Sequence, residues 1–284
     1  MRSSRALGLL LVGTLAATLA GCGGSGGGAP VLAPHTHTGI PAGDGIRTSY
    51  VGYTLADLKV PARAGVPGRL SFHIETYQHK PLTRYVTDLT KDMHVYVVST
   101  DFSVYRHVHP VLGADGTWRG NLTVPVDGTY RIVTEFTAYK PGGGDQMVLG
   151  ALRTIGEPRT AVPLPPASTS ATANGLTVTV TKAPTVGYEH QMELGLSKDG
   201  KAAALGTYLG VFAHVSAFDV RTGAIVHMHP LGPPVEKDGK SLLDFHTGFE
   251  EPGTYRMFVQ ARVSGIVWTV PITVEVTGQP SPEL

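Results

Sequence analysis

One histidine pattern occurs twice in the sequence, and this repeat constrains the fold more than any other feature. The first copy has His94 followed by His107-Val108-His109-Pro110, and the second has His214 followed by His227-Met228-His229-Pro230. Each histidine of the second copy lies 120 positions after its counterpart. Such agreement indicates a tandem duplication, so we expect two domains of the same fold.

Both copies are predicted to consist of β-strands. Residues 70–74, 177–180 and 272–276 alternate in side-chain character or β-branching with a period of two, and no convincing helix appears. Glycine and proline account for 57 of 284 residues, which suits short strands joined by turns. Gly128-Thr129-Tyr130-Arg131 recurs as residues 253–256, and both segments resemble the tyrosine corner of immunoglobulin-type folds. The prediction is an all-β protein of two tandem immunoglobulin-like (cupredoxin-like) antiparallel β-sandwiches related by internal duplication.

The N-terminus predicts export. Arg2 and Arg5 precede the apolar run 6–20, which is typical of a signal peptide. The run ends in Leu19-Ala20-Gly21-Cys22, which resembles a bacterial lipobox and makes Cys22 the predicted lipidation site. The alternative is an ordinary signal peptide with a chance cysteine. Lipidation would anchor the protein to the outer face of the cytoplasmic membrane or cell envelope, and it would leave no thiol for a disulfide.

Composition divides the rest of the chain. The predicted parts are a lipoprotein-type signal peptide (1–21), a flexible tether (22–47), β-sandwich repeat 1 (48–157), a Pro-rich linker (158–173), β-sandwich repeat 2 (174–277) and a tail (278–284).

The repeated histidines are candidate metal ligands. On a strand, residues i and i+2 project from one face, so each His-x-His pair presents two imidazoles side by side. The preceding strand carries His94 or His214, which supplies a third nitrogen ligand if the two strands pair. The predicted ligands are thus His94, His107, His109, His214, His227 and His229. A structural role is the alternative, because a duplication also copies residues that only hold the architecture together.

Imidazole ligands suit copper and zinc, and we favour copper over zinc because the site would be nitrogen-rich and exported. Met228 lies between two ligand candidates, but in a regular strand it points to the opposite face. Binding is expected to weaken below the imidazole reference pKa of about 6.5. The other histidines are assigned to the tether (His35, His37) or to the surface (His73, His79, His190, His246).

The segments 91–98 and 209–215, each followed by His-x-His-Pro, resemble a family of bacterial exported and lipid-anchored proteins with tandem immunoglobulin-like units. The shared pattern is His-x12-His-x-His-Pro, and the likeness covers about residues 48–277. The resemblance implies an envelope protein associated with heavy metals or copper. This chain has Thr90 where the pattern suggests a further histidine, so a fourth nitrogen ligand is not supplied there.

These observations predict a cell-envelope lipoprotein that binds a transition metal ion for capture or delivery. The alternative is a metal-free interaction or structural module that contacts an envelope protein partner. Nucleophile-elbow, zincin, Walker and dinucleotide motifs are absent from the sequence, so we expect no enzyme. With 23 basic and 22 acidic side chains, the chain has no charge excess for nucleic acid, and it meets the membrane only through the lipid anchor.

Overall fold

The computed structural model describes residues 41–187 and 191–279, and every regular element within these ranges is a β-strand. The predicted signal peptide, Cys22, His35, His37 and His190 lie outside the described residues. In the described part of the chain, no helix is long and apolar enough to cross a membrane. The all-β prediction is confirmed.

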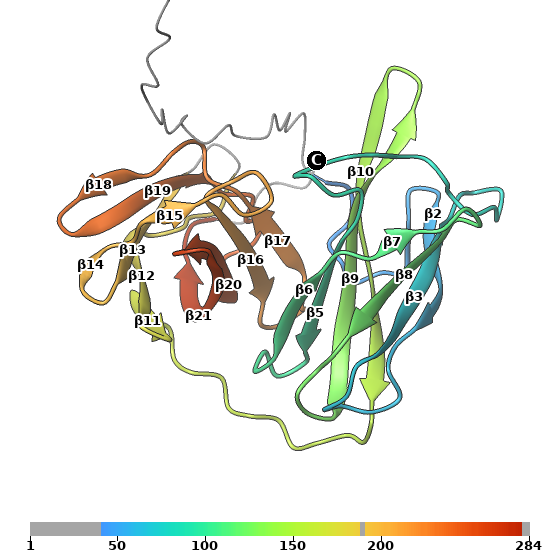
Figure 1. Ribbon diagram of the computed structural model, residues 1–284, viewed down its shortest axis with the longest axis horizontal. Helices are drawn as coiled ribbons and strands as arrows, with labels where there is room; N and C mark the ends of the chain where they lie inside the picture. Colours follow the sequence, from blue (N-terminus) through green and yellow to red (C-terminus); the bar gives the residue numbers. More distant parts are fainter. Residues whose placement is uncertain (1–40, 188–190, 280–284) are drawn as a thin grey trace, which may run out of the picture.

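The first unit is a sandwich of two antiparallel sheets (Figure 1). One sheet has the order β1-β2-β3-β8-β7, with β1 at Ser49–Tyr50, β2 at Tyr53–Lys59, β3 at Gly68–Glu75, β8 at Thr117–Leu122 and β7 at Val111–Leu112. The other has the order β10-β9-β5-β6, with β4 also on β9; the bounds are β10 at Gly143–Ile155, β9 at Gly128–Lys140, β5 at His94–Ser99, β6 at Tyr105–Val108 and β4 at Tyr85–Val86. Alternate residues of β3 and β5 fill the core between the sheets: Leu70, Phe72, Ile74, Val95 and Val97.

The second unit repeats this plan. One sheet has the order β11-β12-β13-β19-β18, with β14 on β13; the bounds are β11 at Ser170–Ala173, β12 at Leu176–Lys182, β13 at Gln191–Lys198, β19 at Lys240–His246, β18 at Val235–Lys237 and β14 at Lys201–Ala202. The other has the order β15-β20-β16-β17, with β21 on β20; the bounds are β15 at Leu205–Gly206, β20 at Gly253–Val263, β16 at Ala213–Asp219, β17 at Ile225–Met228 and β21 at Ile266–Val276. Its core contains the equivalent apolar residues of β13, β16 and β20.

The duplication extends to strand register and to the tyrosine corners. Tyr96 pairs with His107 in the β5–β6 ladder, and Ser216 pairs with His227 at the same place in the β16–β17 ladder. The Tyr130 hydroxyl donates to the Val126 carbonyl at 2.5 Å, and the Tyr255 hydroxyl donates to the carbonyl four residues earlier at 3.0 Å. Both buried tyrosines therefore close the same structural corner.

The two sandwiches lie side by side, with β5 and β6 facing β16 and β17 (Figure 1). A buried apolar cluster joins them and includes Val98, Tyr105, Val133, Phe218 and Phe258. The rings of Tyr105 and Phe258 stack with centroids 4.4 Å apart. The sheet face that carries the histidines in each unit is thus covered by the corresponding face of the other unit.

Two segments differ from the sequence expectation. Residues 170–173 of the expected linker form β11 and pair with β12. Near the end of the expected tether, Ala42 bridges to Met147 of β10, and the Asp44 carbonyl accepts a hydrogen bond from the Ile225 amide at 2.9 Å. Composition indicated free chain in both places. A local hairpin with β12 holds residues 170–173 in place, and long-range backbone hydrogen bonds hold Ala42 and Asp44.

Candidate metal centre

The structure brings together the three predicted histidines of each unit. His94 begins β5, His107 lies in the neighbouring β6 and His109 follows the end of that strand. His94, His107 and His109 form one group whose ligand nitrogens all lie within 4.8 Å of one another, and His214, His227 and His229 form a second such group. We call these the first triad and the second triad.

Strand alternation explains why the imidazoles meet. His94 and Tyr96 project from one face of β5. Val95 and Val97, which alternate with them along the strand, project from the other face into the sandwich core. His107 pairs with Tyr96 in register, so its ring lies on the same face as His94. The predicted geometry on neighbouring strands is therefore present, but the face points at the other unit rather than at open solvent.

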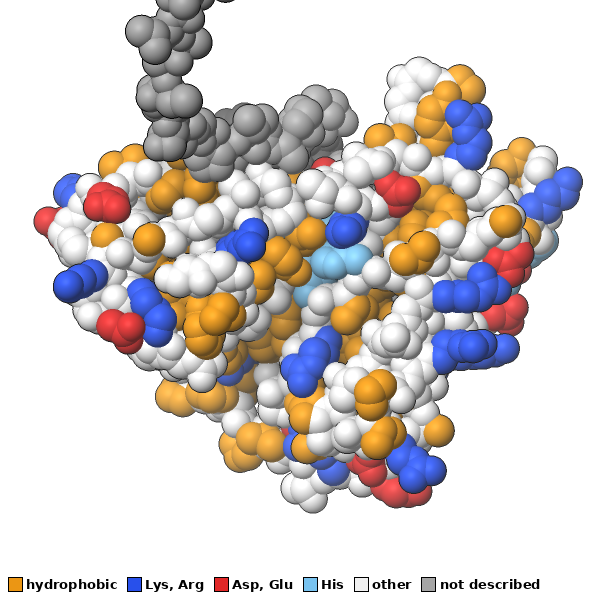
Figure 2. All heavy atoms as spheres, in the orientation of Figure 1, with side chains coloured by type: hydrophobic (Ala, Val, Ile, Leu, Met, Phe, Trp, Pro, Cys, Tyr) orange, Lys and Arg blue, Asp and Glu red, His pale blue; other side chains and the backbone are white. Residues whose placement is uncertain are grey.

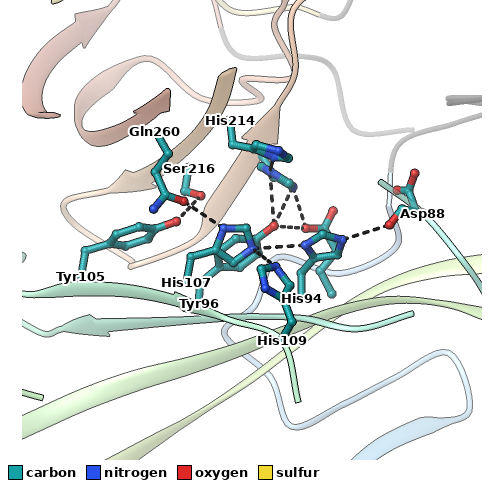
Figure 3. A network of polar contacts seen from close by, with 11 residues as sticks. Asp88, His94, Tyr96, Tyr105, His107, His109, His214, Ser216 and Gln260 are labelled. Atoms are coloured by element: carbon teal, nitrogen blue, oxygen red, sulfur yellow. Dashed lines mark hydrogen bonds and ion pairs between the residues drawn. The ribbon is translucent and has the colours of Figure 1, made fainter. Parts of the chain in front are cut away.

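Hydrogen bonds assign the proton positions in the first triad (Figure 3). His94 Nε2 lies 3.2 Å from the Asp88 carbonyl, which only accepts, so Nε2 carries the proton and Nδ1 presents a lone pair. Gln260 Nε2 donates to Thr269 at 3.1 Å, and its Oε1 accepts from His107 Nδ1 at 2.9 Å. His107 Nε2 then also presents a lone pair, 3.1 Å from His94 Nδ1. His109 Nε2 lies 3.2 Å from the same His107 nitrogen.

The second triad has the same arrangement. His214 Nε2 donates to the Tyr208 carbonyl at 2.9 Å, which leaves Nδ1 with a lone pair. His227 Nδ1 donates to the carboxylate of Glu135 at 2.7 Å, which leaves its Nε2 with a lone pair. These two lone pairs face each other at 3.4 Å. The ring of His229 lies 4.4 Å from that of His227 and 5.2 Å from that of His214, measured between centroids.

A tight turn positions the carbonyl in each unit. Asp88 and Lys91 exchange both backbone hydrogen bonds, each at 2.9 Å, around Leu89 and Thr90, which have positive φ angles of 45° and 68°. The equivalent turn of the second unit spans Tyr208 to Val211, and its third residue is Gly210. The backbone of these two-residue hairpin turns fixes the tautomer of the buried histidine six residues further on.

The two triads face each other across the domain interface, and Figure 3 shows His214 of the second triad beside the first triad. The ring centroids of His107 and His214 are 5.9 Å apart, and those of His94 and His227 are 6.2 Å apart. His94 and His214 are buried, whereas the other four histidines keep part of their surface. Figure 2 shows histidine side chains at the surface between the two halves of the molecule.

Burial disfavours the charged form of four of the six triad imidazoles. It is the main cause that lowers the pKa of His94, His107 and His214, and together with neighbouring cationic groups it lowers the pKa of His109 to about 3. Neutral imidazole is the form that binds metal. The expectation that binding weakens below pH 6.5 used the reference pKa, and the lowered pKa of His94, His107, His109 and His214 moves their competition with protons to lower pH.

Burial alone would raise the pKa of Glu135. The nearby His227 and His94, together with hydrogen bonds from His227 and Tyr96, outweigh burial and lower it to about 2. The Tyr96 hydroxyl donates to Glu135 Oε2 at 2.7 Å and lies 2.7 Å from His227 Nδ1. An ionised carboxylate therefore lies at the centre of the interface.

The remaining predicted features lie away from the triads. Met93 and Met228 are buried inside the two sandwich cores, so neither thioether joins a triad. His73 contacts Glu75 at 3.2 Å on the outer face of β3, and His79 and His246 are exposed. Among the described histidines, those assigned to the surface are thus separate from the six candidate ligands.

Sequence reasoning missed Tyr96, Glu135 and Gln260. Glu135 and Gln260 are equivalent residues of β9 and β20 at the offset of 125 that relates Tyr130 to Tyr255. If the comparison of Tyr130 with Tyr255 is extended by five residues along each strand, it reaches a polar residue within an apolar strand in both units. Nothing in the local sequence shows that each of them contacts the opposite unit.

The fold and this centre define a class of protein: a pair of β-sandwich domains with two histidine triads opposed at their interface. The chain belongs to the family described as Domain of unknown function (DUF8832), whose profile matches residues 48–143 and 171–278, one stretch in each unit. No curated protein matches the sequence.

Several solved structures of other proteins resemble the chain weakly. Invasin, a bacterial integrin-binding protein, is 15% identical over 81% of this chain and 40% of its own, with a TM-score of 0.24. InvD of Yersinia pseudotuberculosis is 13% identical over 81% of this chain and 60% of its own, with a TM-score of 0.22. The tandem immunoglobulin domains of titin are 11% identical over 80% of this chain and 98% of their own, with a TM-score of 0.17. The chain spans less than two thirds of the two bacterial proteins, and none of these similarities carries an argument about function.

Proposed function

We propose that each histidine triad binds one transition metal ion, with copper favoured over zinc, and that the protein captures or delivers this ion at the cell envelope. The observation that carries the proposal is the pair of opposed lone pairs in each triad. His94 Nδ1 and His107 Nε2 face each other at 3.1 Å, and neither has a proton to donate in the assigned tautomers. Two lone pairs at this distance repel each other, and a cation bound by both nitrogens removes this repulsion.

The distances fit a metal ion. A tetrahedral ion with metal–nitrogen bonds of about 2.0–2.1 Å separates its ligand nitrogens by about 3.3–3.4 Å. The nitrogen pairs of the first triad lie 3.1 and 3.2 Å apart, and the measured pair of the second triad lies 3.4 Å apart. Small rotations of the rings admit the ion, and three imidazoles leave a coordination position open for water or an exchanging ligand.

The choice of copper rests on the nitrogen-only ligand set and on the predicted signal peptide, since an exported protein would meet an oxidising compartment. Zinc accepts the same ligands and is the second candidate. The lipobox-like sequence at Cys22 supports attachment to the envelope, and the Pro-rich linker together with the tether is consistent with a domain pair held near the membrane. In this proposal the protein binds and transfers ions and catalyses no reaction.

The second candidate function is a metal-free interaction or structural module. It is favoured by the hydrogen bonds that His107 and His227 make to Gln260 and Glu135 of the opposite units. In that case the histidines would serve to dock the two domains.

Metal analysis of the full chain in detergent tests both candidates. We expect two equivalents of copper or zinc in the wild type, one in His109→Ala, one in His229→Ala, and two in the control His73→Ala. His109 and His229 are the matched outer ligands of the two triads, and His73 is a histidine outside them. A chain that binds neither metal, with an unfolding temperature that drops in the two triad variants, would support the structural module instead.

A further inference from the structure

Glu135 and Gln260 hold equivalent positions in the two units but differ in charge. Glu135 of β9 is opposite His94 in the β5–β9 register, and Gln260 of β20 is opposite His214 in the β16–β20 register. Each side chain crosses the interface and binds the middle histidine of the other unit's triad, Glu135 to His227 and Gln260 to His107. Each triad is therefore oriented by a residue of the opposite domain.

The surroundings of the two middle histidines differ further. Tyr96 completes a triangle with Glu135 and His227, in which all three contacts are 2.7 Å. The equivalent of Tyr96 in the second unit is Ser216, which instead hydrogen-bonds Tyr105 at 2.9 Å. His107 therefore receives a neutral amide, whereas His227 receives a carboxylate supported by a phenol.

We propose, building on the metal-binding function above, that the triads are two non-equivalent and coupled ion sites, and that Glu135 and Gln260 set the order in which they fill. The second triad takes the first divalent ion and the first triad takes the second. Glu135 and Gln260 are positioning residues in this scheme, because each acts on the ion through a histidine.

The chemistry of the outer hydrogen bond determines the order. A carboxylate that accepts the Nδ1–H of His227 makes its Nε2 a stronger donor to the metal than an amide oxygen does for His107. Substitution of such partners typically changes metal affinity by about 10–100-fold. Glu135 also lies beside His94, so its charge attracts an ion in either triad, but its hydrogen bond reaches only the ligand of the second.

The short distance between the triads couples them. Their rings approach to 5.9–6.4 Å between centroids, so the first ion repels the second across a partly buried interface. The negative charge of Glu135 between them offsets part of this repulsion. The second equivalent therefore binds more weakly than the first, and its affinity depends on occupation of the first site.

Competitive titration of Zn²⁺ against a chromophoric chelator, with the full chain in detergent, tests the order. We expect two steps in the wild type, with only the tighter step left in His109→Ala and only the weaker step left in His229→Ala. In the His109→Ala background, Glu135→Gln should weaken the remaining step about 10–100-fold. In the His229→Ala background, Gln260→Glu should strengthen it.

The exchange variant Glu135→Gln/Gln260→Glu is the decisive measurement. It keeps the size of both side chains and moves the charge, so the first triad should fill before the second. Tyr105→Phe, which removes a different interface hydrogen bond, should leave the order unchanged. Two equal steps in the wild type, or an order that the exchange does not reverse, would overturn the inference while leaving metal binding intact. Failure to bind either Zn²⁺ or copper would instead overturn the proposed function.

Discussion

His94 is oriented by the Asp88 carbonyl, which lies in a turn whose two central residues have left-handed backbone conformations. Left-handed backbone is costly for a β-branched residue such as Thr90, which is exposed and has a φ of 68°. The second unit has Gly210 at the same place. The first unit therefore carries backbone strain at Thr90 that the second avoids at Gly210, whereas the preceding leucine is left-handed in both units.

Thr90→Gly should increase the free energy of unfolding by about 1 kcal/mol, because glycine adopts positive φ without steric cost. Thr90→Ala removes the threonine atoms beyond Cβ but keeps the Cβ itself, so its free energy of unfolding should increase by less. Urea unfolding of the three proteins measures the difference. Equal stabilities of the glycine and alanine variants would contradict the assignment of strain to the backbone.

The metal-free protein should lose stability as the pH falls from about 6.5 toward 3. Burial lowers the pKa of four triad histidines in the folded state, so below pH 6.5 the unfolded chain takes up protons that the folded chain does not. Each such proton reduces the free energy of unfolding by up to about 1.4 kcal/mol per pH unit. The lowered pKa of Glu135 acts in the same direction, because its contribution is present above the unfolded value and is lost as the pH approaches about 2.

Urea unfolding in the presence of a chelator at pH 7.5, 6 and 5 measures this dependence. His109→Ala should show a shallower dependence, since it removes a histidine whose pKa lies at about 3 in the folded state. A stability that is constant over this range would be inconsistent with buried neutral imidazoles.

Phe258→Ala should destabilise the protein by about 3–5 kcal/mol. Its ring is buried at the interface and stacks on Tyr105 with an interplanar angle of 8°, so truncation leaves a cavity between the two units. Tyr77→Ala is the control, because that ring is exposed. Thermal unfolding of both variants checks the prediction, and an effect below about 1 kcal/mol would indicate that the sandwiches do not depend on this contact.

Asp101→Asn should destabilise the protein by about 1–3 kcal/mol and expose the linker to proteases. The buried carboxylate pairs with Arg159 at 2.7 Å and accepts the Val162 amide at 2.9 Å, so it holds the linker against the first unit. Urea unfolding and limited proteolysis measure the two effects. Asp115→Asn breaks an exposed ion pair to Arg119 and should change neither result.

Much of the fold and half of the site geometry follow from local sequence periodicity. Extended chain at the end of β6 places His107 and the following His109 on one face, and the duplicated spacing predicts the same in the second unit. The tyrosine corners at Tyr130 and Tyr255 are equally local, since each hydroxyl meets a carbonyl four residues away. Such features depend on neighbours in sequence and are visible without a structure.

The sequence by itself determined two duplicated β-sandwiches with three candidate ligands in each. Only the tertiary structure decided that the two ligand sets oppose each other and that each depends on the other domain. The contact of Glu135 with His227 spans 92 residues, and that of Gln260 with His107 spans 153. The packing of Tyr105, Phe218, Phe258 and their neighbours determines which face of each sandwich meets the other. No local sequence pattern predicts this choice of face.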